Sequence, residues 1–206
     1  TKRGCPHNCC FCVYTVVEGK KVRVNPVDEV IKEMKQLYEM GVRGFWFTDA
    51  QFIPTKNHIQ DAKLLLQAIK DQGWTDLKWA AYIRADNIDR ELAQLMVETG
   101  MSYFEIGITS GSQELVRKMQ LAYNLKTVLE NCRMLVEAGF RNHVSVNYSF
   151  NVFDETPNTI KQTIAYHREL ENIFGKGLVD PAIFFIGLQP HTLLEKYALE
   201  NNILKP

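Results

Sequence analysis

Four of the five cysteines in this chain fall within eight residues near its start: Cys5, Cys9, Cys10 and Cys12. An odd number of cysteines crowded at one end makes a poor disulfide framework. Clustered thiols in a reducing compartment usually bind metal instead. The spacing therefore predicts a metal site and a cytoplasmic location.

Two metal chemistries suit these residues. Structural zinc needs four ligands in a closed tetrahedron, which Cys5, His7, Cys9 and Cys12 could supply under strain. Zinc sites usually pair two separated elements, however, and no second element follows downstream. A [4Fe–4S] cluster held by Cys5, Cys9 and Cys12 would leave one iron without a protein ligand. An open iron needs a ligand from outside and therefore indicates chemistry rather than structural support.

The two remaining cysteines are not expected to be ligands. Cys10 lies next to a ligand and is expected to point away from the metal. Cys132 stands alone in a predicted helix, which is typical of a core residue.

The elements that must position this site alternate between helix and strand. Apolar residues at helical spacing, each run followed by glycine or closed by a cap, predict helices over residues 26–40, 57–72, 89–99, 125–138, 157–174 and 192–200. Short apolar runs between them predict strands over residues 45–48, 77–83, 103–108, 144–150 and 182–188. Strict alternation of this kind favours a parallel sheet with right-handed crossovers.

Two parallel architectures compete for this pattern. An open doubly wound sheet usually has a Gly-rich turn after its first strand, and none is present. A closed eight-unit barrel needs about 250 residues, and the chain has 206. Five units, plus a strand expected before Thr1, predict an α/β fold with a partial (β/α)6 TIM-like barrel of parallel strands. We expect one domain over residues 1–206, as a fragment of a longer protein.

The charge balance limits the partners that this domain can hold. Lys and Arg together number 24, as do Asp and Glu, so the net charge is zero. That argues against retention on nucleic acid or on an anionic membrane by bulk charge. No apolar run approaches the roughly 20 residues of a spanning helix. We therefore expect neither nucleic acid nor membrane as a partner.

The cysteine motif resembles the signature of the radical S-adenosylmethionine enzymes: Cys-x3-Cys-x2-Cys with an aromatic residue, Phe11, before the last cysteine. Residues 3–6, Arg-Gly-Cys-Pro, are similar to the branch that contains cobalamin-dependent radical enzymes and methylthiotransferases. Residues 47–52, 106–112, 150–156 and 189–192 resemble further motifs of these enzymes. The chain departs from the pattern at four positions: Ala50, Thr109, Asn151 and Asp154.

The resemblance implies a [4Fe–4S] cluster and S-adenosylmethionine, which is cleaved reductively to a deoxyadenosyl radical. The expected reaction is cobalamin-dependent methyl transfer to, or rearrangement of, an unreactive carbon or phosphorus centre, with cobalamin bound by another domain. The alternatives are a methylthiotransferase acting on tRNA or a ribosomal protein, and a zinc-stabilised binding module without catalysis. The implied partners are a small-molecule substrate and a reducing protein of flavodoxin or ferredoxin type.

In a parallel barrel the site residues gather at the C-terminal ends of the strands. Asp49 follows the first predicted strand and could accept hydrogen bonds from the cofactor ammonium, or could be a turn or N-cap aspartate. Arg84 follows the second and could bind the cofactor carboxylate, or form a surface salt bridge. Ser110 could reach the ribose or the methionine part of the cofactor. Gln189 could line the adenine through its backbone.

Three polar residues, Asn147, Ser149 and Asn151, share one face of a strand. They predict either a lined cavity or a mutually hydrogen-bonded core layer. The resemblance adds Phe11, Gln51 and Thr109 to the expected cofactor-binding residues, because they lie within or beside its motifs. No catalytic residue is predicted.

Overall fold

The computed structural model describes residues 1–152 and 154–204 of the chain. Phe153, which falls in one of the expected motifs, and Lys205 and Pro206 lie outside the described residues. The central feature is a five-stranded parallel sheet whose strands follow the order of the sequence. Its strands are β3 (Gly44–Phe47), β4 (Lys78–Tyr82), β5 (Met101–Thr109), β6 (Val144–Phe150) and β7 (Val179–Phe185).

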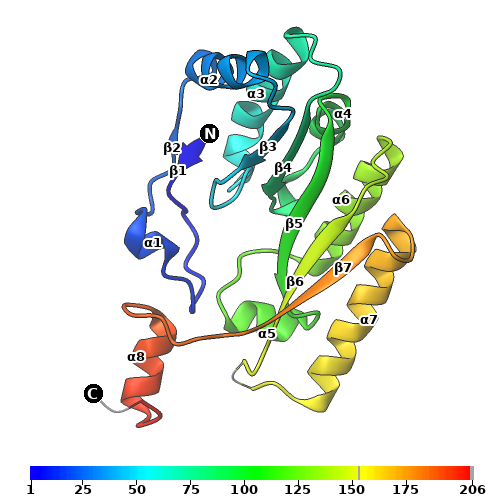
Figure 1. Ribbon diagram of the computed structural model, residues 1–206. Helices are drawn as coiled ribbons and strands as arrows, with labels where there is room; N and C mark the ends of the chain where they lie inside the picture. Colours follow the sequence, from blue (N-terminus) through cyan, green and yellow to red (C-terminus); the bar gives the residue numbers. More distant parts are fainter. Residues whose placement is uncertain (153, 205–206) are drawn as a thin grey trace.

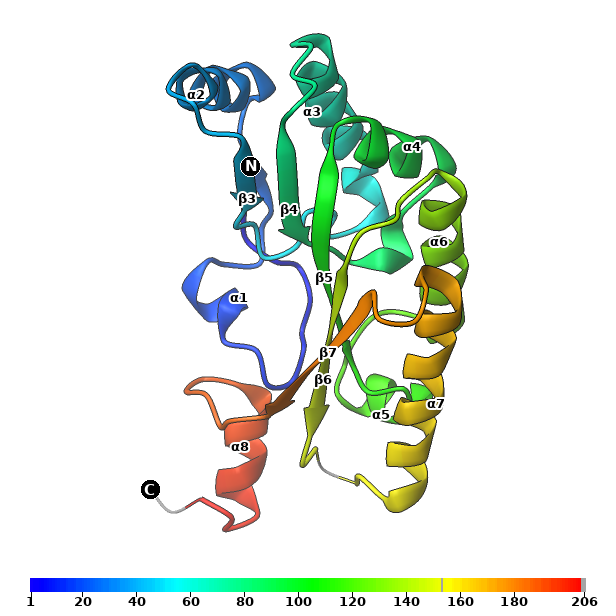
Figure 2. The same ribbon diagram turned by 45° about the vertical axis from the view of Figure 1, so that its right-hand side comes forward.

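Helices follow each of the first four strands and pack against one face of the sheet, which curves away from them (Figures 1 and 2). These helices are α3 (Ile59–Asp71), α4 (Arg90–Glu98), α6 (Leu125–Glu137) and α7 (Pro157–Phe174), with α2 (Val27–Glu39) preceding β3. Shorter helical segments lie in the connections: Lys56–His58, Ala85–Asn87 and α5 (Gln113–Lys118). The arrangement confirms the predicted α/β class with parallel strands of a partial barrel.

Local signals explain where several of these helices begin and end. Asn124 caps α6 by accepting hydrogen bonds from the backbone N–H groups of Lys126 and Thr127. Thr156 and Thr159 form a capping box at the start of α7. Gly100, which follows α4, has a φ of 87°, and an added Cβ would lie 2.2 Å from the carbonyl oxygen of Leu77. Glycine is therefore required where α4 turns into β5.

The last strand lies three residues earlier than the sequence pattern predicts. The apolar run at residues 184–188 suggested a strand over 182–188, but β7 pairs with β6 from Val179 to Phe185. Proline lacks the N–H that a sheet ladder needs, so Pro181 argued against a strand there. The observed β7 is an edge strand, where proline is tolerated.

The first 24 residues form a separate feature on the concave side of the sheet (Figure 2). The short strands β1 (Lys2–Arg3) and β2 (Arg23–Val24) pair antiparallel, and between them lie the cysteine-containing loop and α1 (Tyr14–Val17). The final helix, α8 (Leu193–Glu200), lies beside this loop. The six-stranded barrel placed its first strand before Thr1, so that strand remains a prediction. None of the described helices is both long and apolar enough to cross a membrane.

Candidate functional site

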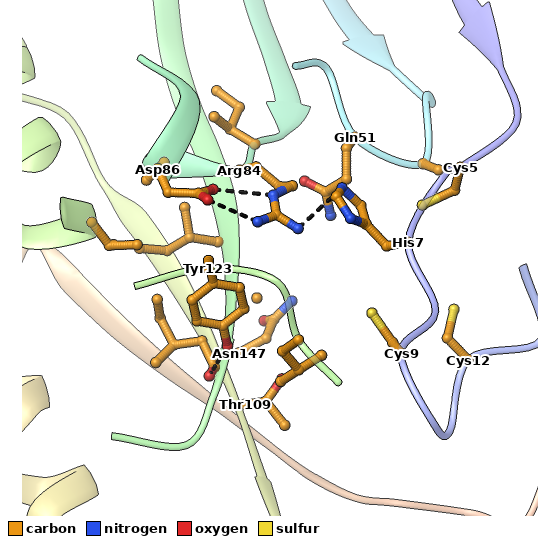
Figure 3. Close-up of a pocket in the computed structure, with 18 of the residues that line it drawn as sticks. Cys5, His7, Cys9, Cys12, Gln51, Arg84, Asp86, Thr109, Tyr123 and Asn147 are labelled. Atoms are coloured by element: carbon orange, nitrogen blue, oxygen red, sulfur yellow. Dashed lines mark hydrogen bonds and ion pairs between the residues drawn. The ribbon is translucent and has the colours of Figure 1, made fainter. Parts of the chain in front are cut away.

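A cavity of about 300 Å³ lies between the cysteine-containing loop and the C-terminal ends of β4, β5 and β6. Figure 3 shows three thiols, those of Cys5, Cys9 and Cys12, along one side, with Arg84 and Asn147 across from them. Five aliphatic side chains also line the cavity: Ile83, Ile106, Ile108, Leu121 and Val128. A mostly apolar chamber with a few polar groups is typical of a buried small-molecule site.

The cysteine-containing loop, residues 4–13, is held by close backbone contacts. Gly4 has a φ of 91°, and an added Cβ would lie 2.2 Å from the carbonyl oxygen of Lys21. The N–H of Cys5 donates to the carbonyl of Gly19 over 3.0 Å. The N–H of Cys12 donates to the carbonyl of Cys9 over 3.1 Å, which closes a turn between these two cysteines. The loop geometry therefore depends on glycine at position 4.

The three thiols facing the cavity are free of disulfides. Burial raises the pKa of Cys9 to about 12 and also raises the pKa of Cys5. Metal ligation requires thiolates, so loading this site must release protons. Within the described part of the chain, no three side chains of the Cys, His, Asp or Glu types are arranged to hold a single metal ion.

The remaining cysteines lie elsewhere. Cys10 is 5% exposed within the apolar core, where its N–H donates to the carbonyl of Met119. Its carbonyl in turn accepts from the N–H of Leu194, which ties the loop to α8. Cys132 is fully buried in α6. Neither thiol is among the groups that line the cavity.

Arg84 enters the cavity from the end of β4 and is held by an acid two residues away. Its Nε and Nη2 donate to the two carboxylate oxygens of Asp86 over 3.0 and 2.8 Å. Its guanidinium lies 5.5 Å from the ring centre of Tyr123, close enough for a cation–π interaction. This clamp leaves Nη1 pointing toward the cysteine-containing loop (Figure 3).

The His7 ring contacts the Arg84 guanidinium at the edge of the cysteine-containing loop. Burial and the nearby Arg84 guanidinium lower the pKa of His7, which favours the neutral ring. Its Nε2 lies 2.6 Å from the Pro54 carbonyl and 3.0 Å from Arg84 Nη1. One ring nitrogen cannot donate to the carbonyl and accept from the guanidinium at once. When His7 donates to Pro54, Nη1 of Arg84 can meet an acceptor on a ligand.

Among the described residues, two buried polar atoms in the cavity have no hydrogen-bond partner: Oε1 of Gln51 and Oδ1 of Asn147. The Nδ2 of Asn147 donates to Glu105 over 3.3 Å, which fixes the amide and leaves its oxygen directed away from that contact. Burying an unpaired amide oxygen costs free energy. Both atoms therefore indicate a ligand that brings donors, such as an ammonium group or hydroxyls.

Backbone strain marks the wall of the cavity at Thr109. This β-branched residue has a φ of 58°, and the pairing of β5 with β6 shifts register between Gly107 and Thr109. A positive φ is unusual for a β-branched residue, and such strain clusters at binding sites. Phe11 and Ser149 also line the cavity. The structure thus brings six of the ten predicted cofactor-binding residues together here: Phe11, Gln51, Arg84, Thr109, Asn147 and Ser149.

Asp49 lies outside this lining and has a different set of partners. It is 1% exposed and accepts hydrogen bonds from the backbone N–H and the ammonium of Lys2, over 2.8 and 3.1 Å. The backbone nitrogen and the hydroxyl of Thr1 also contact the same carboxylate. Burial acts to raise the pKa of Asp49, but the Lys2 ammonium and the Thr1 contacts outweigh it and hold that pKa below its usual range. Asp49 therefore ties the start of the chain to the end of β3.

Three other predicted residues also lie away from the described lining of the cavity. The hydroxyl of Ser110 accepts from the N–H of Ser112 and lies 3.4 Å from the Thr163 hydroxyl on α7. Asn151 accepts from the N–H of Ile186 through its side-chain oxygen. Gln189 follows β7 by several residues because that strand ends at Phe185, so the prediction that it ends the strand is wrong. Contacts of these residues with a cofactor remain predictions.

Four further side chains line the cavity: His7, Tyr14, Asp86 and Tyr123. The sequence analysis considered His7 only as a zinc ligand and did not predict the other three. Tyr123 is partly buried, its desolvation raises its pKa, and its hydroxyl donates to the Ile108 carbonyl. It comes from the connection between α5 and α6, where no strand-end rule applies. Asp86 could have been predicted from the sequence, because an acid two residues after the predicted Arg84 can pair with it.

Comparison with known proteins defines the class. The chain belongs to the radical SAM superfamily, whose sequence profile matches residues 1–166. It is therefore a radical SAM enzyme domain, and membership implies a [4Fe–4S] cluster and S-adenosylmethionine. The cavity fits both groups: three free thiols stand at one wall, Arg84 and Asn147 stand across from them, and Gln51 and Asn147 each bring an unpartnered amide oxygen.

Several of the relatives are named methyltransferases or methylthiotransferases. The chain is 30% identical, over 99% of its length, to the uncharacterized methyltransferase PH0819 of Pyrococcus horikoshii and covers 42% of it. It is 28% identical over 65% of its length to the threonylcarbamoyladenosine tRNA methylthiotransferase MtaB of Rickettsia prowazekii, covering 33% of it. The radical S-adenosylmethionine methyltransferase TsrM of Kitasatospora setae, solved with cobalamin and a [4Fe–4S] cluster, superposes with a TM-score of 0.83. That match has 23% identity and covers 98% of this chain and 36% of TsrM. The chain thus spans less than half the length of each.

Proposed function

We propose that the protein containing this chain is a cobalamin-dependent radical SAM methyltransferase acting on an unreactive carbon or phosphorus centre of a small molecule. The observation that carries the proposal is that three free thiols and two unpartnered amide oxygens line one cavity. The likeness to PH0819 and to TsrM, the latter solved with cobalamin, supports methyl transfer over other radical reactions. Cobalamin would be held by a part of the protein beyond this chain.

Each wall of the cavity has a distinct role in this proposal. Cys5, Cys9 and Cys12 hold the cluster, which supplies the electron that cleaves S-adenosylmethionine when both are bound. Arg84, clamped by Asp86, faces the cofactor carboxylate, and two ammonium or hydroxyl groups donate to Gln51 Oε1 and Asn147 Oδ1. The aliphatic walls exclude water, which strengthens these polar contacts.

The test uses the full-length protein, purified and reconstituted without oxygen. We expect about four irons per chain and, after reduction in the presence of S-adenosylmethionine, release of 5′-deoxyadenosine or S-adenosylhomocysteine. Cobalamin should raise the yield of S-adenosylhomocysteine, because each methyl group that S-adenosylmethionine gives to cobalamin leaves one S-adenosylhomocysteine. A protein that takes up four irons but consumes no S-adenosylmethionine, with or without cobalamin, would contradict the proposal.

A second candidate function is methylthio transfer to tRNA or to a ribosomal protein, which the likeness to MtaB favours. The two functions differ in what the product gains. A methyltransferase adds a methyl group, whereas a methylthiotransferase adds sulfur as well. Mass spectrometry of bulk tRNA and ribosomal proteins from cells with and without the gene separates them: a methylthio group lost with the gene would replace the first proposal by the second.

A further inference from the structure

Three aromatic rings lie together on the concave face of the sheet, opposite the face that the helices cover (Figure 2). Phe47 and Phe104 are buried in the core beneath the helices. Because side chains alternate along a strand, their neighbours Trp46 and Tyr103 point to the other face. The centre of the Trp46 ring lies 5.5 Å from that of Tyr82 and 5.6 Å from that of Tyr103. Trp46 and Tyr82 are 41% and 38% exposed, so parts of their rings are open to a ligand.

A carboxylate lies beside these rings without a counter-charge. Glu105 is the partner of Tyr82 in the β4–β5 register, and it accepts a hydrogen bond from the Tyr103 hydroxyl over 3.3 Å. Burial and the nearby Glu105 carboxylate raise the pKa of Tyr82, which keeps that side chain neutral. Glu105 is half-buried and takes part in none of the ion pairs that the described residues form. The aromatic–acid cluster is defined as Trp46, Tyr82, Tyr103 and Glu105.

This cluster is continuous with the cavity beside the cysteine-containing loop. Asn147 lines that cavity, and its Nδ2 donates to the Glu105 carboxylate over 3.3 Å. Gly107 also lines the cavity and follows Glu105 by two residues on β5. Two residues of a strand span about 7 Å. A small molecule that extends from the cavity along the concave face would therefore meet the carboxylate first and the rings next.

Exposed aromatic faces beside an unpaired acid suit an organic cation. The face of an aromatic ring carries negative partial charge and attracts an ammonium group, most strongly when the ring is tryptophan. A carboxylate accepts charge-assisted hydrogen bonds from the same group, and these are stronger than hydrogen bonds between neutral groups. A neutral or anionic group would gain neither contribution. A bound cation would also offset the desolvation of Glu105.

We propose that the aromatic–acid cluster binds a protonated amine of the methyl-accepting small molecule. The proposal rests on the proposed function and names the substrate class of that site, an organic amine. The ammonium group would donate to Glu105, and the Trp46 and Tyr82 rings would contact the apolar carbons beside it. The rest of the molecule would reach past Asn147 into the cavity.

The experiment uses the reconstituted full-length protein and two probes of similar shape, phenethylammonium and the neutral 2-phenylethanol. Dissociation constants for both are measured by ligand-observed nuclear magnetic resonance. The key variant is Glu105→Gln, which removes the charge and keeps an oxygen that can accept from Tyr103 and Asn147. Its matched control, Glu33→Gln, makes the same change in charge at an exposed position of α2.

We expect the parent to bind phenethylammonium about tenfold more tightly than 2-phenylethanol, and Glu105→Gln to lose this preference. Trp46→Leu should weaken binding of the cation about threefold, because the best cation–π partner is removed. The Glu33→Gln control should bind both probes like the parent. Equal affinity of the parent for the two probes, a preference retained by Glu105→Gln, or an equal loss in the control overturns the proposal.

This design separates failure of the amine site from failure of the proposed function. If the parent takes up no iron, the proposed function fails, while probe binding still decides the amine site. If the cluster forms and S-adenosylmethionine is consumed but the two probes bind equally, the amine site fails alone. Should Glu105→Gln impair folding, Trp46→Leu and Tyr82→Leu take its place, and an unchanged preference for the cation in both overturns the proposal.

Discussion

Residues 1–24 and the five-stranded sheet face the same cavity from opposite sides, but they are stabilised differently. The sheet strands are paired over many residues and covered by helices whose apolar faces form one core. Residues 1–24 have little regular structure and depend on individual contacts at Gly4, Cys5 and Asp49. A sheet tolerates the loss of one contact, whereas this segment should not. Sensitivity to substitution should therefore differ sharply between the two.

The largest difference is expected between two glycines. Gly4→Ala places a Cβ 2.2 Å from the Lys21 carbonyl at a φ of 91°, so the loop must move and most of the bound iron should be lost. Gly44→Ala, in β3, meets no atom within 4 Å and should keep its iron. Iron content and far-ultraviolet circular dichroism of both variants check this prediction. Equal iron in the two would contradict the account of the loop.

The tie between the two regions is the buried pair of Lys2 and Asp49. Asp49→Asn leaves the Lys2 ammonium buried without its counter-charge, which should cost about 3–5 kcal/mol of stability. Denaturant titration measures the loss. Asp28→Asn, at an exposed position in α2, serves as the control and should cost less than about 1 kcal/mol. If the two variants were equally stable, the pair would not anchor the chain to β3.

The pair of Lys2 and Asp49 should also make the stability of the protein depend on pH. The pKa of Asp49 is lowered in the folded protein, because the Lys2 ammonium and the Thr1 contacts outweigh the effect of burial. A lowered carboxyl pKa contributes stability above the ordinary value near 4, and this stability is lost as pH falls through the folded value. The parent should therefore lose more stability than Asp49→Asn as pH falls below about 4. Acid titration of both proteins checks this, and an equal loss of stability in the two would refute it.

On the sheet side, a single unpartnered atom should matter for binding and not for folding. Asn147→Ala removes the Oδ1 that we assign to the cofactor, and it should weaken binding of S-adenosylmethionine about tenfold. Asn158→Ala, at an exposed position in α7, is the control and should bind like the parent. Equilibrium dialysis with the reconstituted protein measures both. Unchanged affinity in Asn147→Ala would remove this residue from the cofactor site.

The contrast between the two regions also explains what the sequence could predict. The periodic patterns of β6 and α7 placed both elements at the observed residues, because alternation and capping are local signals. The approach of Gly4 to Lys21 and the pairing of Asp49 with Lys2 join segments that are distant in sequence. No local pattern encodes such contacts.

The candidate site was also predicted only in part, because local sequence signals locate some of its residues and not others. The strand-end rule found Arg84, because parallel strands bring their C-terminal ends to one edge, and the alternation of polar residues along β6 found Asn147. The strand-end rule failed for Gln189, since Pro181 obscured where β7 begins and ends. It had no means of finding Tyr123, which enters the cavity from a connection rather than from a strand.

The central claim is that Cys5, Cys9 and Cys12 alone hold the cluster, and counting iron and sulfide in five single Cys→Ala variants tests it most directly. After anaerobic reconstitution, Cys10→Ala and Cys132→Ala should retain about four irons and four sulfides per chain, because both thiols lie in the core. Each of the other three variants should lose most of both. A Cys10→Ala protein that folds but loses its cluster, or a Cys9→Ala protein that keeps it in full, would contradict the account.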